Sequence, residues 1–212
     1  MKPTTGAIND LTRTAQERLG RLIWLAAPLA LPLSPKDRRL ISYVVIEAAN
    51  LWAQYSQCLF LSCALGAKDV SGQRIVVNRA PTMNDALTLA VHATKPKMRG
   101  TYRQWQRRDL PDFQQKSELG KTVRYVRASV AADVDLALGY QSRVLEDLPT
   151  MRNFFAHKAE LAATKARNLA PRYGLSRALS PETLLCTPPR GGADVVLREW
   201  IADLNAILTL MP

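Results

Sequence analysis

The longest helical pattern in the sequence runs from about Pro35 to Leu65, and it restricts the fold more than any other feature of the chain. Apolar residues recur at spacings of three and four in its first half, and they occupy nearly every position from Leu59 onward. Ser34 supplies a hydroxyl cap, Pro35 suits the first helical position, and Asp37 lies near the positive end of the helix dipole. A helix that is apolar on all sides has to be buried. We therefore predict an all-α fold with this helix at its centre.

Further helices are predicted on both sides of this segment from the same spacing, with proline or glycine near their ends. They cover about residues 8–27, 82–94, 117–148, 150–170 and 194–211. Pro149 is expected to separate two of them, and Gly139 is a weak point before it. Residues 66–81 are predicted to form a loop or small hairpin, and residues 171–192 an irregular surface segment. The prediction is a single-domain helical bundle of five to seven helices over residues 1–212, with core helices at about 35–170 and a C-terminal helix at about 194–211.

The charge of the chain predicts a polyanionic partner. There are 29 Lys and Arg residues against 18 Asp and Glu residues, a formal net charge of +11 with a sequence pI near 10.0. Nucleic acid, a membrane surface and a highly acidic protein all suit such a charge, and nucleic acid is preferred. The three cysteines have no C-x-x-C spacing, so neither a disulfide framework nor a zinc site is indicated. The most apolar run, residues 58–67, is about half of the roughly 20 residues that a membrane span needs. No signal peptide is evident, so a cytoplasmic, soluble protein is expected.

The most informative segment for chemistry is Met151-Arg-Asn-Phe-Phe-Ala-His-Lys158. If a helix begins after Pro149, Arg152 and Asn153 lie in its first turn, where free amides and the dipole favour a phosphate. Asn153 and His157 are four residues apart and share one face of a helix. Arg152 is roughly 140° around the helix from His157, so its long side chain has to swing to join them.

These residue types suit the cleavage of RNA without a metal or other cofactor. The reaction needs a base for the ribose 2′-hydroxyl, an acid for the leaving 5′-oxygen and cations around the phosphorus. Histidine serves in both proton transfers, and arginine presents a planar fork to phosphate oxygens. One chain provides one such histidine, so we expect a twofold homodimer that joins Arg152 and His157 from both chains. The expected product carries a 2′,3′-cyclic phosphate.

The segment Arg-Asn-x-x-x-His, with the apolar Phe154-Phe155-Ala156 inside it, resembles the signature of HEPN domains, the higher eukaryotes and prokaryotes nucleotide-binding family. The resemblance covers this motif and the helical plan of about residues 35–170. It implies a metal-independent endoribonuclease that acts as a homodimer, with Arg152, Asn153 and His157 as catalytic residues. Bacterial members often serve as toxins of toxin–antitoxin pairs or as defence effectors, so the resemblance also brings an antitoxin protein into consideration as a partner.

Several other residues are predicted to support this site. Glu47 lies in the otherwise apolar central helix, where a carboxylate needs a cation or hydrogen-bond donors. Because some HEPN proteins carry an acidic residue there, Glu47 is expected to orient Arg152 or His157; the alternative is a structural or exposed residue. Basic and aromatic residues are expected to contact RNA, and the alternative is a solvated charged surface. They are Lys158, Arg124, Arg127, Arg103 and Trp105.

One rival interpretation remains. In it, Arg152 forms a salt bridge, Asn153 caps the helix and His157 is a satisfied polar group, so the protein binds nucleic acid or acts as an adaptor without catalysis. A metal-dependent nuclease is disfavoured because the chain has only two histidines and no H-E-x-x-H motif. A nucleotide-hydrolysing enzyme is disfavoured because no glycine-rich phosphate loop is present.

Overall fold

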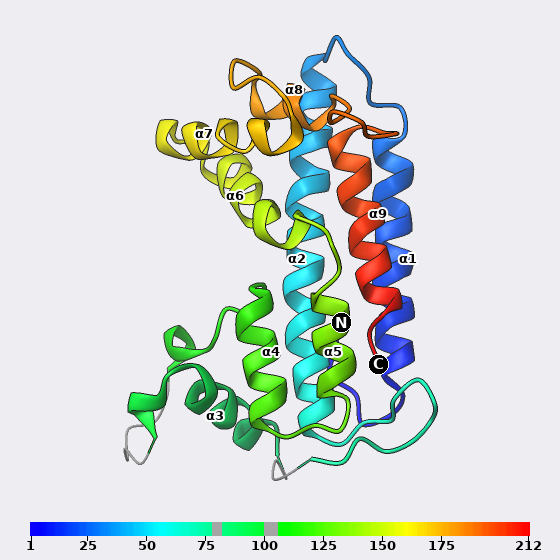
Figure 1. Cartoon of the computed structure of the whole chain (residues 1–212), viewed down its shortest axis with the longest axis vertical. Coiled ribbons are helices and arrows are strands. Elements are labelled where there is room, and N and C mark those ends of the chain that lie inside the picture. The colour runs from blue at the N-terminus through cyan, green and yellow to red at the C-terminus, as the bar shows by residue number, and fades with distance from the viewer. Residues whose placement is uncertain (78–81, 100–105) are drawn as a thin grey trace. The chain divides into compact units, whose positions relative to one another are not determined.

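The computed structural model describes residues 1–77, 82–99 and 106–212, and all its regular structure is helical (Figure 1). The described residues form nine α-helices: α1 (Ile8–Ala26), α2 (Pro35–Ala64), α3 (Met83–Thr94), α4 (Lys116–Tyr125), α5 (Ala131–Leu138), α6 (Val144–His157), α7 (Glu160–Arg167), α8 (Pro181–Leu185) and α9 (Val196–Thr209). Two isolated bridges, from Lys68 to Ala7 and to Arg74, are the only β-type pairing in these ranges. The all-α prediction is confirmed.

The chain divides into two compact units, and three of the helices contribute residues to both. The first unit comprises Met1–Gln16, Trp52–Tyr140 and Ile207–Pro212, and the second comprises Glu17–Leu51 and Gln141–Ala206. The number of domains stays a prediction.

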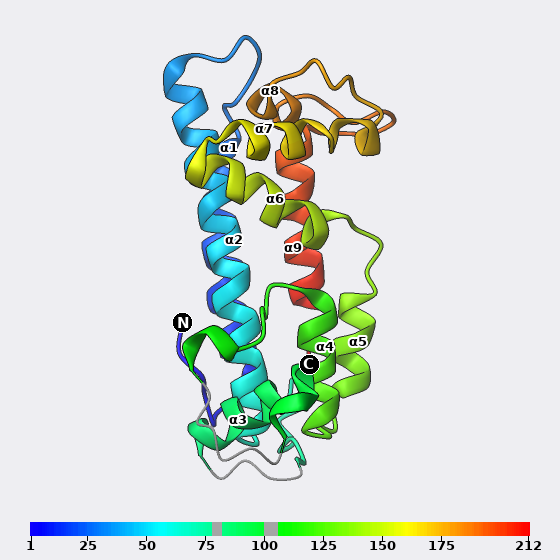
Figure 2. The same cartoon turned by 90° about the vertical axis from the view of Figure 1, so that its left-hand side faces the viewer.

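In the first unit, α4 packs against both α3 and α5. Figure 2 shows α4 and α5 side by side. The ring of Phe60 stacks on that of Phe113 with centroids 5.4 Å apart, and the indole of Trp52 donates to the carbonyl oxygen of Gln114 at 2.9 Å. The loop before α4 is thereby fastened to α2.

In the second unit, α6 and α7 follow one another and lie side by side (Figure 2). Arg198 of α9 donates to the carboxylate of Asp194 at 2.7 Å and to the carbonyl oxygen of Ala27 at 3.0 Å. These bonds connect the start of α9 with the end of α1.

The helix starts that the sequence predicted are confirmed at α2 and α3. The amide of Asp37 donates to Ser34 Oγ at 3.2 Å, and the amide of Ser34 donates to the Asp37 carboxylate at 2.9 Å. This reciprocal pair satisfies two amides at the start of α2. The hydrogen bonds from Ser34 also lower the pKa of Asp37. Thr82 caps α3 in the same manner, because Thr82 Oγ1 accepts from the amide of Asp85.

The prediction of one continuous helix over residues 117–148 is wrong. Residues 116–125 and 131–138 form α4 and α5, and Arg127 between them has a left-handed φ of 51°. This conformation reverses the chain so that α5 packs back onto α4. Pro149, expected to separate helices, lies inside α6. The helix predicted over residues 150–170 likewise ends at His157. These breaks and the short helix α8 account for nine helices in place of five to seven.

None of the helices in the described ranges is both long enough and apolar enough to cross a membrane.

We predict that Tyr55→Phe destabilises the protein by about 1 kcal/mol, because the hydroxyl of Tyr55 is fully buried and lies 3.0 Å from Thr12 Oγ1. Its removal leaves the buried hydroxyl of Thr12 without this partner. Urea unfolding followed by circular dichroism measures the change. Tyr43→Phe is the matched control, because Tyr43 is exposed and the same change there should stay within about 0.5 kcal/mol. Equal effects of the two changes would contradict the prediction.

Candidate active site

Helix α6 carries the motif and is anchored by one apolar face. Its buried apolar residues are Val144, Leu145, Leu148, Met151, Phe154 and Phe155. The rings of Phe154 and Phe155 meet edge to face with centroids 4.9 Å apart. Because both phenylalanines of the motif are buried, the polar residues around them lie on the sides of α6 that face away from its buried apolar face.

The three predicted catalytic residues lie on the last two turns of α6. Arg152 is partly buried, whereas Asn153 and His157 are exposed. Asn153 and His157 are one turn apart on the same face, as the spacing predicted. Within the described part of the chain, none of the three side chains has a hydrogen bond or an ion pair. The structure therefore presents them along the surface of one helix end, where a ligand can reach them.

The predicted phosphate site at the start of the motif helix is wrong. Helix α6 begins at Val144, so the amides of Arg152 and Asn153 lie deep inside it and are used by its own hydrogen bonds. Free amides instead follow the motif, because α7 begins at Glu160 and its N-cap residue, Ala159, has no side-chain capping bond.

Lys158 joins the two helices in a left-handed conformation with φ at 48°. It closes α6 by donating its amide to the carbonyl oxygen of Phe154 at 2.7 Å. Glycine adopts this conformation without strain, whereas a lysine in it is strained. The exposed ammonium of Lys158 directly follows His157 in the chain.

We predict that Lys158→Gly raises the free energy of unfolding by about 0.5–1 kcal/mol, because it relieves the left-handed strain. Urea unfolding measures this gain. Lys158→Ala is the control, because it removes the same charge but keeps the Cβ atom and the strain. If Lys158→Ala stabilises the protein as much as Lys158→Gly, the gain comes from charge and the prediction fails.

The partner of Glu47 in the structure is Arg18. Arg18 Nη2 lies 3.8 Å from Glu47 Oε2, and both side chains are about one-third exposed. Within the described residues, Glu47 makes no hydrogen bond or ion pair with Arg152 or His157. The expected pairing is therefore replaced by a partly exposed ion pair between α1 and α2 of the second unit.

Of the other predicted RNA-contacting residues, Arg124 and Arg127 belong to the first unit. Arg103 and Trp105 lie outside the described residues. Arg124 Nη1 donates to both carboxylate oxygens of Asp135, at 2.5 and 2.6 Å, so much of its charge is offset locally. Arg127 is exposed at the turn between α4 and α5.

A buried carboxylate in α6 was not predicted. Asp147 is fully buried, and it accepts hydrogen bonds from Arg172 Nη1 and, at 2.6 Å, from the hydroxyl of Tyr173. That hydroxyl accepts in turn from the indole of Trp200 at 2.8 Å. Arg172 Nη2 also donates to Glu146 at 2.8 Å. This cluster joins α6 to the 3₁₀ turn Ala170–Tyr173 and to α9.

Burial is the main influence on the ionisation of this cluster. It raises the pKa of the Asp147 carboxyl, and the hydrogen bond from Tyr173 and the charge of Arg172 act in the opposite direction. Burial and the bond to Asp147 also raise the pKa of Tyr173. The sequence contained one signal for this cluster, because Asp147 has the spacing of the buried face of α6.

Comparison with known proteins adds no relative: neither a family model, nor a curated protein, nor a solved structure matches the chain. In the described part of the chain, no group of three or more His, Cys, Asp and Glu side chains is placed to hold a metal ion. The candidate site consists of Arg152, Asn153, His157 and Lys158.

Proposed function

We propose that the chain is a metal-independent endoribonuclease whose active site forms between two copies of the protein. The observation that carries the proposal is the arrangement at the end of α6: Asn153 and His157 are exposed on one face, the partly buried Arg152 directly precedes Asn153 in the chain, and these side chains are not engaged by the described protein groups. A formal net charge of +11 favours a polyanionic substrate.

In the proposed reaction, His157 of one chain removes the proton from the ribose 2′-hydroxyl. The 2′-oxygen forms a bond to phosphorus while the bond from phosphorus to the 5′-oxygen breaks. The partner's His157 gives a proton to that leaving oxygen, and the two arginines at position 152 balance the charge that develops on the phosphoryl oxygens. The products are a 2′,3′-cyclic phosphate and a 5′-hydroxyl, and water is not consumed in this step.

The free amides at the start of α7 and the ammonium of Lys158 suit the proposed substrate. Both follow His157 directly in the chain, so a phosphate held by them lies close to the imidazole. The resemblance of the motif to HEPN domains supports the same activity. A role as a toxin or defence effector, with an antitoxin as partner, belongs to that resemblance alone.

Incubation of the purified protein with total RNA in excess chelator tests the proposal. We expect cleavage, with fragments that carry a 2′,3′-cyclic phosphate and a 5′-hydroxyl. Arg152→Ala should abolish this cleavage, and Arg21→Ala, which removes an exposed arginine elsewhere in the same unit, should not. RNA that stays intact with all variants would overturn the proposal.

The second candidate is a nucleic-acid-binding or adaptor protein without catalysis. It is favoured by one observation: Glu47, the residue expected to orient the site, is paired with Arg18. This candidate predicts that the wild type and Arg152→Ala both leave RNA intact while they bind it.

A further inference from the structure

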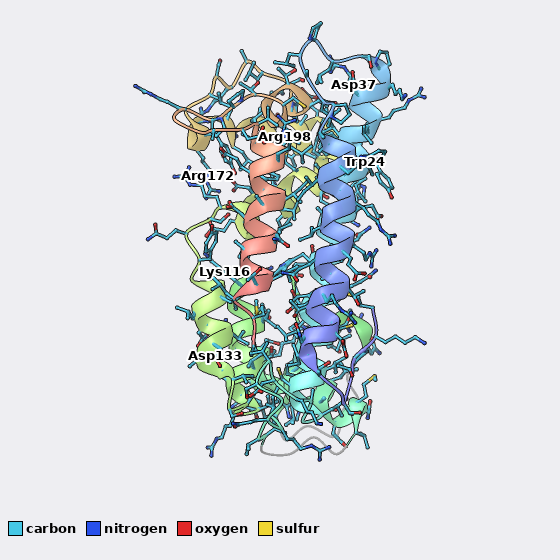
Figure 3. All side chains as sticks on the ribbon, turned by 90° about the vertical axis from the view of Figure 1, so that its right-hand side faces the viewer. Trp24, Asp37, Lys116, Asp133, Arg172 and Arg198 are labelled. Carbon is cyan, nitrogen blue, oxygen red and sulfur yellow. The ribbon has the colours of Figure 1, made fainter. Side chains whose placement is uncertain are left out.

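A cleft with a volume of about 420 Å³ lies at the start of α6, at the other end of this helix from His157. Its walls come from residues 141–143, 172–174 and 189–190 and from α9, all in the second unit. Figure 3 shows Arg172 beside α9. The volume is within the range of clefts that hold small ligands.

One wall of the cleft is cationic and is formed by Arg143, Arg172 and Arg190. Arg172 is occupied by Glu146 and Asp147, and Arg143 Nη1 donates to the carbonyl oxygen of Arg172. The guanidinium of Arg190, in contrast, has no hydrogen bond or ion pair within the residues that the structure describes. An anion in the cleft can therefore bind Arg190 without breaking an existing pair.

The backbone at Arg190 packs against the lining segment 172–174. The amide of Arg190 donates to the carbonyl oxygen of Tyr173 at 2.9 Å. Gly174 has a φ of 69°, and a Cβ atom at this position would lie 2.6 Å from the Cβ of Arg190. Only glycine permits this close approach, which fixes the base of the free arginine beside the cleft.

The cleft also offers hydrogen-bond acceptors and aromatic groups. Asp203 accepts from Ser142 Oγ at 2.5 Å and is not in an ion pair with any cation in the described ranges, and Glu199 also lines the cleft. Tyr173 and Trp200 also line the cleft. A ligand that suits these groups has both an anionic group and hydroxyl or amino donors.

We infer that this cleft binds a nucleoside phosphate, with the phosphate at Arg190 and Arg143 and the ribose or base donors toward Asp203 and Glu199. Position 143 is about 20 Å from position 157 along α6, at 1.5 Å per helical residue. If the ligand is a nucleotide of the RNA strand, it lies several nucleotides from the cleaved bond. This case rests on the proposed function. A free nucleotide has the same chemistry, and the experiment separates the two sources.

Calorimetric titration of the full-length protein tests this inference with three probes: adenosine monophosphate, inorganic phosphate and an unstructured 2′-O-methyl RNA oligonucleotide that 2′-hydroxyl attack cannot cleave. We expect Arg190→Ala to weaken binding about tenfold, the effect of losing a hydrogen bond to a charged group. Arg21→Ala, with the same loss of charge elsewhere, should bind as the wild type does. Adenosine monophosphate should bind more tightly than inorganic phosphate, and Asp203→Ala should remove that difference.

The outcomes separate this inference from the proposed function. A tenfold effect on the oligonucleotide supports an RNA subsite, and an effect on adenosine monophosphate alone supports a free nucleotide. If Arg190→Ala and Arg21→Ala bind all probes equally, or if inorganic phosphate binds as tightly as adenosine monophosphate, the inference is overturned even when RNA is cleaved. If Arg190→Ala weakens probe binding but the protein never cleaves RNA, the ligand site in the cleft is supported and the proposed ribonuclease activity is overturned.

Discussion

Replacement of His157 by alanine is expected to slow RNA cleavage by a factor of about 10²–10⁴, the usual effect of removing a general acid or base. In the proposed dimer, the single substitution removes both the group that accepts the 2′ proton and the group that protonates the leaving oxygen. The fold should persist, because His157 is exposed at the end of α6 and has no hydrogen bond among the described residues. The measurement is the initial rate of cleavage of a labelled RNA in excess chelator.

His92 provides the matched control, because it is the other histidine of the chain. Its backbone carbonyl oxygen accepts a hydrogen bond from Arg99 Nε at 2.9 Å, and His92→Ala retains that bond. This variant should cleave RNA at the wild-type rate. Cleavage by His157→Ala at the rate of His92→Ala would show that the motif histidine takes no part in the reaction, whereas unchanged RNA binding without cleavage by the wild type would favour the adaptor.

Arg172→Ala is expected to destabilise the protein by about 3 kcal/mol near pH 8, because it leaves the fully buried Asp147 without its cation. The hydrogen bond from Tyr173 remains but does not neutralise the charge. Urea unfolding followed by circular dichroism gives the change in the free energy of unfolding. Arg177→Ala, at an exposed site outside this cluster, should change it by less than about 0.5 kcal/mol.

The same variant should depend on pH in a defined direction. Burial already raises the pKa of Asp147 in the folded protein above its ordinary value, and loss of Arg172 raises it further. The folded state then binds the proton more readily than the unfolded state. The contribution of Asp147 to the stability of the variant is therefore largest below the ordinary pKa of an aspartate, and it is lost as the pH rises through the folded-state pKa. Adding Asp147→Asn to Arg172→Ala should remove this dependence, and a flat profile without Asp147→Asn would contradict the account.

Periodicity and capping residues were sufficient to predict the helices that use ordinary start and stop signals. The helices α1, α2 and α3 begin and end close to the predicted residues, because Ser34 and Thr82 cap two of them in the expected way. The turn at Arg127 was missed since no glycine or proline marks it. Its left-handed backbone accompanies the packing of α5 on α4, which is a tertiary effect.

The candidate site was predictable only as far as it is local. Asn153 and His157 share a face of α6 because they are four residues apart, and the sequence alone indicates this. The partners of Asp147 were not predictable, since Arg172 and Tyr173 come from a segment without a regular pattern. The phosphate-site prediction is wrong because it depends on a helix break at Pro149, and Pro149 lies inside α6.

Pro149 removes one backbone hydrogen bond from α6. Because Pro149 has no amide proton, the carbonyl oxygen of Leu145 lacks its usual donor one turn later. We expect α6 to open more easily at this missing bond than elsewhere along its length. Deuterium uptake should accordingly differ on the two sides of Pro149, and fraying of the first turn should leave the turns around Phe154 protected.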